Sequence, residues 1–192
     1  MTGRGQVEAR ARTELTMFAY PWDLQQDGVS SSLQLVHELG CQRLAMAVAY
    51  HSAEVIAPRR RRSVHTTAEG NVAHLPLRGG FSDLTLPTGM LAREHPELPA
   101  KLAEAADASD LRLTAWVIIC HNSGLAGARP DAAMENCFGD RSGHGLCPSN
   151  AVVRTYALEL CRQVLEVGIF DELFIESAAY LIGRHGHPHE LW

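Results

Sequence analysis

The chain has 192 residues, of which 46% are hydrophobic and 20% charged, and its formal net charge at pH 7 is -5. This composition predicts a folded domain with a hydrophobic core and excludes a chain that is disordered over most of its length. The acidic balance argues against a nucleic-acid partner, because the one arginine run, at residues 59–62, is short and is expected to be a solvated loop.

The cysteines and the first residues indicate the compartment. Five cysteines without a CxxC pair favour neither a disulfide framework nor a zinc ribbon, so we expect a reduced, cytoplasmic protein. No segment approaches membrane-spanning length, and no apolar stretch of signal-peptide type follows the N-terminus. We therefore expect one domain over residues 1–192, with a flexible N-terminus at residues 1–13 and no membrane partner.

Four nearly continuous apolar runs predict strands at residues 15–20, 44–50, 113–120 and 173–175. Such continuity is typical of parallel strands that are covered on both faces. Between them, apolar residues at helical spacing predict helices near residues 29–39, 98–106 and 152–164. The helix-end signals are Gly40 and Gly168 after helix ends, Pro99 in a first turn, and Ser149 or Asn150 as an N-cap.

This order of elements predicts an α/β fold of parallel β/α units, the first half of a TIM (β/α)8-type barrel. A complete barrel usually needs about 250 residues. The chain is therefore a fragment, a compact open sheet, or a half barrel that a second copy completes as a homo-oligomer. Within the first long loop, residues 64–67 and 71–75 are expected to form a small hairpin.

The predicted loops at residues 52–97 and 122–149 both follow strand ends, which is the edge where α/β folds place their sites. At each of the four strand ends the sequence changes from apolar to polar residues. Because parallel strands end at one edge of a sheet, we expect these side chains to converge on one pocket. The candidate site residues are Trp22, Asp23, His51, His121, Asn122 and Glu176.

Glu176 directly follows an apolar strand, a placement that suits a general acid, base or nucleophile. The alternative is a carboxylate paired with an arginine of a neighbouring loop. His51 and His121 suit hydrogen bonding to hydroxyl groups or proton transfer, although a histidine at a strand end is often structural. Trp22 offers a ring to a planar ligand or simply covers the core.

Two further segments carry polar side chains. Residues 136–150 are rich in Gly, Asp, Ser and His, and Asp140 is a candidate ligand contact. The tail at residues 185–190 reads HGHPHE, so His185, His187 and His189 suit zinc or another divalent metal. The alternative for this tail is a hydrogen-bonding loop over the pocket, because it matches no established metal-binding spacing.

Several segments stand in order along the chain: FAYPWD at 18–23, AYHS at 49–52, CHNS at 120–123, NCFGD at 136–140, LCPSN at 146–150 and the HGHPHE tail. Together they resemble an uncharacterised bacterial family of glycoside-hydrolase-like TIM-barrel proteins, over residues 16–190. In related barrels a Cys/Asp-Pro-Ser-type segment, a helical arginine and a strand-end acid recur together, as do Cys147, Arg154 and Glu176 here. The resemblance implies that Glu176 is a catalytic or substrate-binding carboxylate.

The chain departs from this family in two respects. Family members continue well past the fourth strand, where a second carboxylate would normally be supplied. Aromatic residues make up only 6% of the chain, whereas sugar-binding clefts usually have several stacking rings.

Three functions follow from these observations. The first is a carbohydrate-active hydrolase whose Glu176 acts on a sugar or other small-molecule substrate that Asp23, His51, His121 and Asn122 orient, with Asp23 or Asp140 as candidate second carboxylate. The second is a metal-dependent hydrolase that uses the histidine tail. The third is a non-catalytic sugar-binding barrel. A cofactor is required only by the second.

Overall fold

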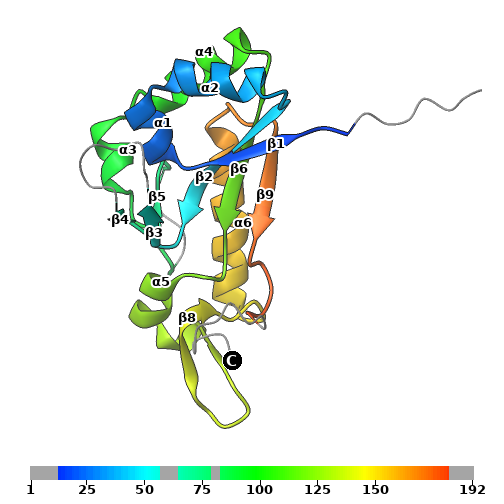
Figure 1. Ribbon diagram of the computed structural model, residues 1–192. Helices are drawn as coiled ribbons and strands as arrows, with labels where there is room; N and C mark the ends of the chain where they lie inside the picture. Colours follow the sequence, from blue (N-terminus) through cyan, green and yellow to red (C-terminus); the bar gives the residue numbers. More distant parts are fainter. Residues whose placement is uncertain (1–12, 57–64, 79–82, 182–192) are drawn as a thin grey trace, which may run out of the picture.

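The computed structural model describes residues 13–56, 65–78 and 83–181. Its main sheet contains four parallel strands in the order β1-β2-β6-β9, as the sequence predicts (Figure 1). The strands are β1 (Thr16–Ala19), β2 (Arg43–Tyr50), β6 (Arg112–Ile118) and β9 (Glu172–Glu176). The helices that connect them are α2 (Val29–Glu38), α4 (Leu98–Ala108) and α6 (Ala151–Glu166).

The predicted helix signals act as expected. Gly40 and Gly168 follow α2 and α6 with positive φ angles of 81° and 78°, a conformation that glycine adopts without a steric penalty. The Asn150 side chain accepts a hydrogen bond from the backbone N–H of Val152 at 2.9 Å and so caps the start of α6. Pro99 lies in the first turn of α4, where its missing N–H costs nothing.

One face of the sheet is covered by the helices. Alternate residues of β2 and β6 point to this face and pack against α2, α4 and α6 in a single hydrophobic core. The fully buried members of this core include Leu33, Leu44, Met46, Leu102, Tyr156 and Leu160. Burial of this size is the main source of the stability of the sheet-helix layer.

The opposite face of the sheet is open. The register places Phe18, Trp116 and Phe174 there, on β1, β6 and β9, and Phe18 and Phe174 are 46% and 43% exposed. In a complete (β/α)8 barrel this face forms the interior.

A β-bulge changes the direction of the last residue of β2. The register between β2 and β6 shifts between Ala47 and Ala49, so Val48 and Ala49 both lie in the helix-covered core. With strict alternation from Leu44, Tyr50 would face the helices; with the bulge it packs on the open face beside Ile118 and Trp116.

The remaining elements are insertions after the strand ends. After β1 comes α1 (Pro21–Asp27), and after β2 come β3 (Ala53–Ile56), β4 (His65–Ala68), β5 (Val72–Ala73) and α3 (Met90–Glu94). After β6 come α5 (Ser123–Ala128), the 3-10 turn η1 (Pro130–Ala132), β7 (Ala133–Glu135) and β8 (Arg141–Leu146). Figure 1 shows the hairpin that contains β8 extending past the ends of β6 and β9.

The predicted hairpin between residues 64–67 and 71–75 is wrong. β4 pairs with β3, and β5 pairs with the end of β2 instead. The reason is that β1 ends opposite Met46, which leaves the edge of β2 beyond it available for β5. No helix within the described ranges is long and apolar enough to cross a membrane.

Candidate functional site

Aromatic side chains gather at the carboxyl end of the open face. Of the five Phe, three Trp and four Tyr residues in the chain, six are joined by ring contacts. Trp116 lies at the centre, with ring centroids 5.1 Å from Phe18, 5.9 Å from Tyr20 and 4.6 Å from Tyr50. Phe174 and Trp22 extend the cluster, 5.3 Å from Phe18 and 4.5 Å from Tyr20. We call these six residues the aromatic cluster.

The carboxylate of Glu176 lies at the border of the aromatic cluster. Its Oε2 accepts a hydrogen bond from the indole Nε1 of Trp116 at 2.7 Å. The next residue, Ser177, has a φ of 54°, which is uncommon for a residue other than glycine. The backbone still continues to pair with β6, because the carbonyls of Glu176 and Ser177 accept from Ile119 and Cys120. The position of Glu176 is therefore fixed through both its side chain and its backbone.

Two histidines lie next to each other at the same edge. The rings of His51 and His121 are 4.6 Å apart, and His51 also stacks on Tyr50 at 4.3 Å. His51 Nδ1 is 2.7 Å from the carbonyl oxygen of Ser52, and this carbonyl can only accept a hydrogen bond. Nδ1 is therefore the donor, which leaves Nε2 of the neutral ring as an acceptor. The structure thus brings together His51, His121 and, through Tyr50 and Trp116, Glu176.

Asn122 is placed differently from the histidines. It is 3% exposed, and its Oδ1 accepts from the backbone N–H of Leu125 at 2.8 Å, which caps the start of α5. This side chain fixes the chain after β6 and orients His121 beside it. Asp23 lies in the first turn of α1, where a carboxylate interacts favourably with the helix N-terminus.

Trp22 packs between other rings of the protein, and its contact with a planar ligand stays a prediction. Its ring stacks on Tyr20 with an interplanar angle of 9°, so it belongs to the aromatic cluster, and it is only partly exposed. On its other side it meets the ring of His74 edge to face at 5.2 Å.

Asp140 lies in the connection between β7 and β8, on the hairpin that extends away from the sheet (Figure 1). Its carboxylate accepts from Asn136 Nδ2 at 3.2 Å, and Asn136 in turn accepts from the backbone of Phe138 and Asp140. These contacts close a loop within the hairpin and do not involve the aromatic cluster.

The histidine tail, with His185, His187 and His189, lies outside the described residues. Within the described ranges, no group of three or more His, Cys, Asp or Glu side chains is arranged to hold a metal ion. The arginine run at residues 59–62 and the N-terminal residues 1–12 also lie outside the described ranges.

The amino end of the open face carries an ionic network. Glu14 pairs with Arg43 and Arg112, and Arg43 also pairs with Glu172. Thr114 Oγ1 donates to Glu172 at 2.7 Å. Hydrogen bonds from Arg112 and Arg43 hold the pKa of Glu14 below its ordinary value, and those from Arg43 and Thr114 do the same for Glu172.

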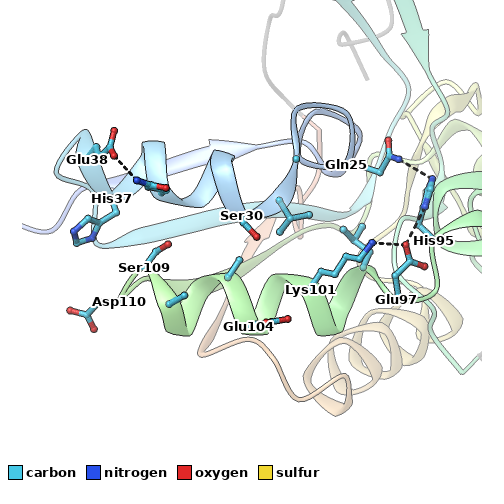
Figure 2. A pocket seen from close by; sticks show the side chains of 16 residues that line it. Gln25, Ser30, His37, Glu38, His95, Glu97, Lys101, Glu104, Ser109 and Asp110 are labelled. Carbon is cyan, nitrogen blue, oxygen red and sulfur yellow. Dashed lines mark hydrogen bonds and ion pairs between the residues drawn. The ribbon is translucent and has the colours of Figure 1, made fainter.

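Two cavities adjoin the site without containing it. The larger, of about 1020 Å³, is a groove between α2 and α4 whose polar side chains largely pair with one another (Figure 2). Glu97 pairs with Lys101 at 3.1 Å, and Gln25 Nε2 lies 3.1 Å from His95 Nε2. In Figure 1 the two helices that line this groove, α2 and α4, lie at the end of the molecule opposite the β8 hairpin. The smaller cavity, of about 300 Å³, lies beside Trp22 and His74.

Trp116 is the residue that sequence analysis missed. It sits in the middle of an apolar strand, where a tryptophan is expected to be core, and only the pairing of β6 with β9 shows that it faces Glu176. A tryptophan in a strand otherwise made of small and aliphatic residues was the one available signal.

Four parallel strands joined by three helices, with aromatic and ionisable side chains at the carboxyl ends of the strands, define part of a (β/α)8-type barrel. No known family model matches the sequence. No curated protein matches it either. Solved structures do match, and they confirm the expected resemblance at the level of fold.

The structure is similar to a hypothetical protein from Ruminiclostridium thermocellum ATCC 27405, with a TM-score of 0.53 and 13% identity over 84% of this chain and 75% of that chain. It is similar to a noncanonic maltogenic alpha-amylase from Thermotoga neapolitana, with a TM-score of 0.54 and 12% identity over 84% of this chain. A proposed alpha-amylase from Salmonella typhimurium gives a TM-score of 0.51 and 17% identity over 99% of this chain.

The chain spans 38% and 30% of the two amylase chains. It therefore corresponds to part of such a barrel. Similarity at these identities concerns the fold, because one barrel fold supports many unrelated activities.

Proposed function

We propose that the carboxyl edge of the half barrel binds carbohydrate and that Glu176 acts there as the acid/base or nucleophilic carboxylate of a glycoside hydrolase. The observation that carries this proposal is the 2.7 Å hydrogen bond between Glu176 and Trp116, at the border of an exposed aromatic cluster. The barrel fold shared with the amylase chains supports it by analogy.

The chemistry of the edge matches a sugar in two ways. Aromatic rings present flat apolar faces, and a pyranose ring has apolar C–H faces that can lie on them. Sugar hydroxyls both donate and accept, so they suit the paired rings of His51 and His121 and the carboxylate of Glu176. The low aromatic content of the whole chain is compatible with sugar binding, since half of its aromatic residues belong to the aromatic cluster.

The indole of Trp116 gives Glu176 a defined orientation. The hydrogen bond uses Oε2 and, within the described residues, leaves Oε1 available to a ligand. In the proposed reaction the carboxylate faces the anomeric carbon or the glycosidic oxygen, and Trp116 acts as a positioning residue. Asn122 positions His121 in a comparable way, through the start of α5.

Hydrolysis by two carboxylates requires a second acid on the opposite side of the bond, about 5–5.5 Å away in retaining enzymes and about 6.5–9.5 Å away in inverting ones. We place it in four further β/α units that cover the open face. Within the described sheet β1 and β9 each have one parallel neighbour, so both edges can accept another strand. Those units come either from additional residues of the same polypeptide or from a second copy of this chain. Light scattering distinguishes the two, because a second copy doubles the mass.

The test compares two glutamates of the same strand. Glu176→Gln changes the carboxyl end of β9, and Glu172→Gln makes the same chemical change at its amino end. We expect Glu176→Gln to lower hydrolysis of a panel of aryl glycosides by about 10²–10⁴-fold, the usual contribution of an acid/base group. Glu172→Gln should leave hydrolysis within about twofold of the unchanged protein, because general acid/base catalysis requires contact with the reacting group.

Two other results decide between catalysis and binding. If no glycoside is turned over but a sugar shifts the melting temperature, and Glu176→Gln reduces that shift, the edge is a sugar-binding site without hydrolysis. The proposal would be overturned if Glu176→Gln were as active as the unchanged protein. It would also be overturned if neither turnover nor sugar binding were detected.

A further inference from the structure

A second polar pocket lies behind Trp22, on the side of its ring away from Tyr20. It has a volume of about 300 Å³ and is formed by α1, the segment that leads from β4 into β5, and α3. Its lining includes Trp22, Glu69, His74, Glu94 and His95. A volume of this size lies at the lower limit of small-molecule sites and accommodates a single sugar ring.

The pocket contains buried polar atoms that lack hydrogen bonds. Trp22 Nε1 and both ring nitrogens of His74 have no hydrogen-bond partner in the described structure, and His74 is 1% exposed. Leaving such groups unpaired is costly, and most buried polar side chains in proteins have a partner. The Trp22 and His74 rings that line this pocket thus carry three buried nitrogens without a partner among the described residues, an observation independent of the cavity itself.

The position of His74 is set by the backbone. Its N–H donates to the carbonyl of Val48, the residue at the bulge of β2, at 2.8 Å, and the preceding Ala73 pairs with Ala49. Burial lowers the pKa of His74 to about 4, so its ring is neutral at physiological pH. A neutral imidazole has one donor and one acceptor nitrogen.

The opposite wall supplies acceptors. Glu69 is held in place by the backbone N–H of Met90, which donates to its Oε2 at 2.5 Å. A Cβ at Gly89 would lie 3.1 Å from that oxygen and 2.8 Å from a methyl group of Val72, so the turn depends on glycine for this close approach. Glu94 adds a second carboxylate, and His95 is held between Gln25 and Glu97.

The geometry points to a binding site for a small neutral polyhydroxyl ligand, of the size of one sugar ring or cyclitol, between Trp22, His74, Glu69 and Glu94. Such a ligand can accept from the Trp22 indole N–H, form a hydrogen bond with one ring nitrogen of His74, and donate to the two carboxylates. Hydroxyl groups meet these opposite requirements because each is both donor and acceptor.

Other ligand classes fit less well. An anion would be repelled by Glu69 and Glu94. A metal ion or an ammonium group cannot accept a hydrogen bond, so it would leave Trp22 Nε1 unpaired. No group of three metal-ligating side chains occurs within the described ranges, which include all the residues named here.

This site is separate from the proposed hydrolytic site and does not require Glu176. Trp22 lines the pocket and also belongs to the aromatic cluster, whereas Trp116 contacts Glu176 and does not line the pocket. In an NMR spectrum of ¹⁵N-labelled protein, a shift of the Trp22 indole N–H resonance without a shift of that of Trp116 therefore reports on the pocket. Trp22→Phe and Trp116→Phe assign the resonances, because each substitution removes one of them.

The experiment titrates D-glucose, D-galactose and myo-inositol into the full chain, with sodium phosphate and zinc chloride as controls. We expect at least one of the three polyols to shift the Trp22 resonance with saturation, and neither control to do so. A shift of Trp22 without a shift of Trp116 that persists in Glu176→Gln supports the pocket whether or not the hydrolytic site is correct. A shift confined to Trp116 supports only the hydrolytic site.

Variants then test the contacts. Trp22→Phe keeps an aromatic ring but removes the N–H donor and the second ring of the indole, so affinity measured by calorimetry should fall by at least about 2–10-fold, the value of one hydrogen bond. Glu94→Gln should weaken binding as well, whereas the matched Glu104→Gln, in the other groove, should not. The inference would be overturned if none of the three polyols gave a saturable shift of Trp22, or if zinc or phosphate gave one instead. Unchanged affinity in both Trp22→Phe and Glu94→Gln would overturn it as well.

Discussion

The two ends of the open face of the sheet use their polar residues in different ways. At the amino end Glu14, Arg43, Arg112 and Glu172 pair with one another in a closed network. At the carboxyl end Glu176 is held by an indole N–H, and within the described ranges no arginine or lysine pairs with it. At the amino end the charges neutralise one another, whereas the carboxylate at the carboxyl end lies beside partly exposed rings, which makes it a candidate for contact with a ligand. The same four strands thus separate a structural end from a candidate functional end.

The largest expected effect comes from removing the ring at the centre of the carboxyl end. Trp116→Ala deletes contacts to Phe18, Tyr20 and Tyr50 together with the hydrogen bond to Glu176. We expect a loss of about 2 kcal/mol in the free energy of unfolding, less than for a fully buried tryptophan, and loss of sugar binding at this edge. Urea unfolding and calorimetry measure the two effects.

Trp116→Phe is the closest control, since it keeps one aromatic ring at this position while it removes the N–H and the second ring of the indole. Its unfolding free energy should fall by less than half as much as that of Trp116→Ala. If Trp116→Ala binds sugar as well as the unchanged protein does, the aromatic cluster has no part in binding. The two ends of the open face would then not differ in function.

A smaller effect is expected at the amino end. Arg43→Met removes the cation that joins Glu14 to Glu172 and leaves Arg112 as the remaining partner of Glu14. The melting temperature should fall by a few degrees at most, because partly exposed ion pairs contribute little. Sugar binding at the carboxyl end should not change. A loss of binding in Arg43→Met with an intact fold would show that the two ends are coupled.

Acid should weaken the amino end selectively. The pKa values of Glu14 and Glu172 lie below the ordinary value of 4.5 because of their arginine and threonine partners. For a carboxylate whose pKa is lower in the folded than in the unfolded protein, the stabilisation that it contributes is fully present above its pKa in the unfolded protein. This stabilisation is lost as the pH falls through its pKa in the folded protein. Urea midpoints of the unchanged protein should therefore drop below about pH 4.5 more steeply than those of Arg43→Met. If the urea midpoints of the two proteins fell in parallel with pH, the ion pairs of Arg43 would not be the cause of the acid sensitivity.

Sequence analysis located the sheet well because its signals were local. Apolar runs, Gly40, Gly168 and Asn150 each act within a few residues, and all four strands and the three connecting helices are confirmed. The half-barrel arrangement followed from the element order, since parallel strands joined by helices have few alternatives.

The site was harder to predict because its decisive features are non-local. The 2.7 Å contact between Trp116 and Glu176 joins residues 60 apart, and it depends on the register of β6 with β9. The bulge that turns Tyr50 to the open face leaves no sequence signal in a run of small apolar residues. The His74 pocket depends on pairing of β5 with β2, which the predicted hairpin had assigned elsewhere.

The smallest effect is expected from the hydroxyl pair that links the first two strands at the carboxyl end. The hydroxyl oxygens of Tyr20 and Tyr50 are 3.3 Å apart, a long hydrogen bond, and burial raises the pKa of Tyr50, so its hydroxyl stays protonated. Tyr50→Phe keeps the ring contacts with Trp116 and His51 and should lower the free energy of unfolding by about 0.5 kcal/mol. Urea unfolding measures this change, with Tyr20→Phe as the reciprocal variant. If both single variants and the double variant lose the same amount, the pair acts as one hydrogen bond; additive losses would mean that each hydroxyl has a separate partner.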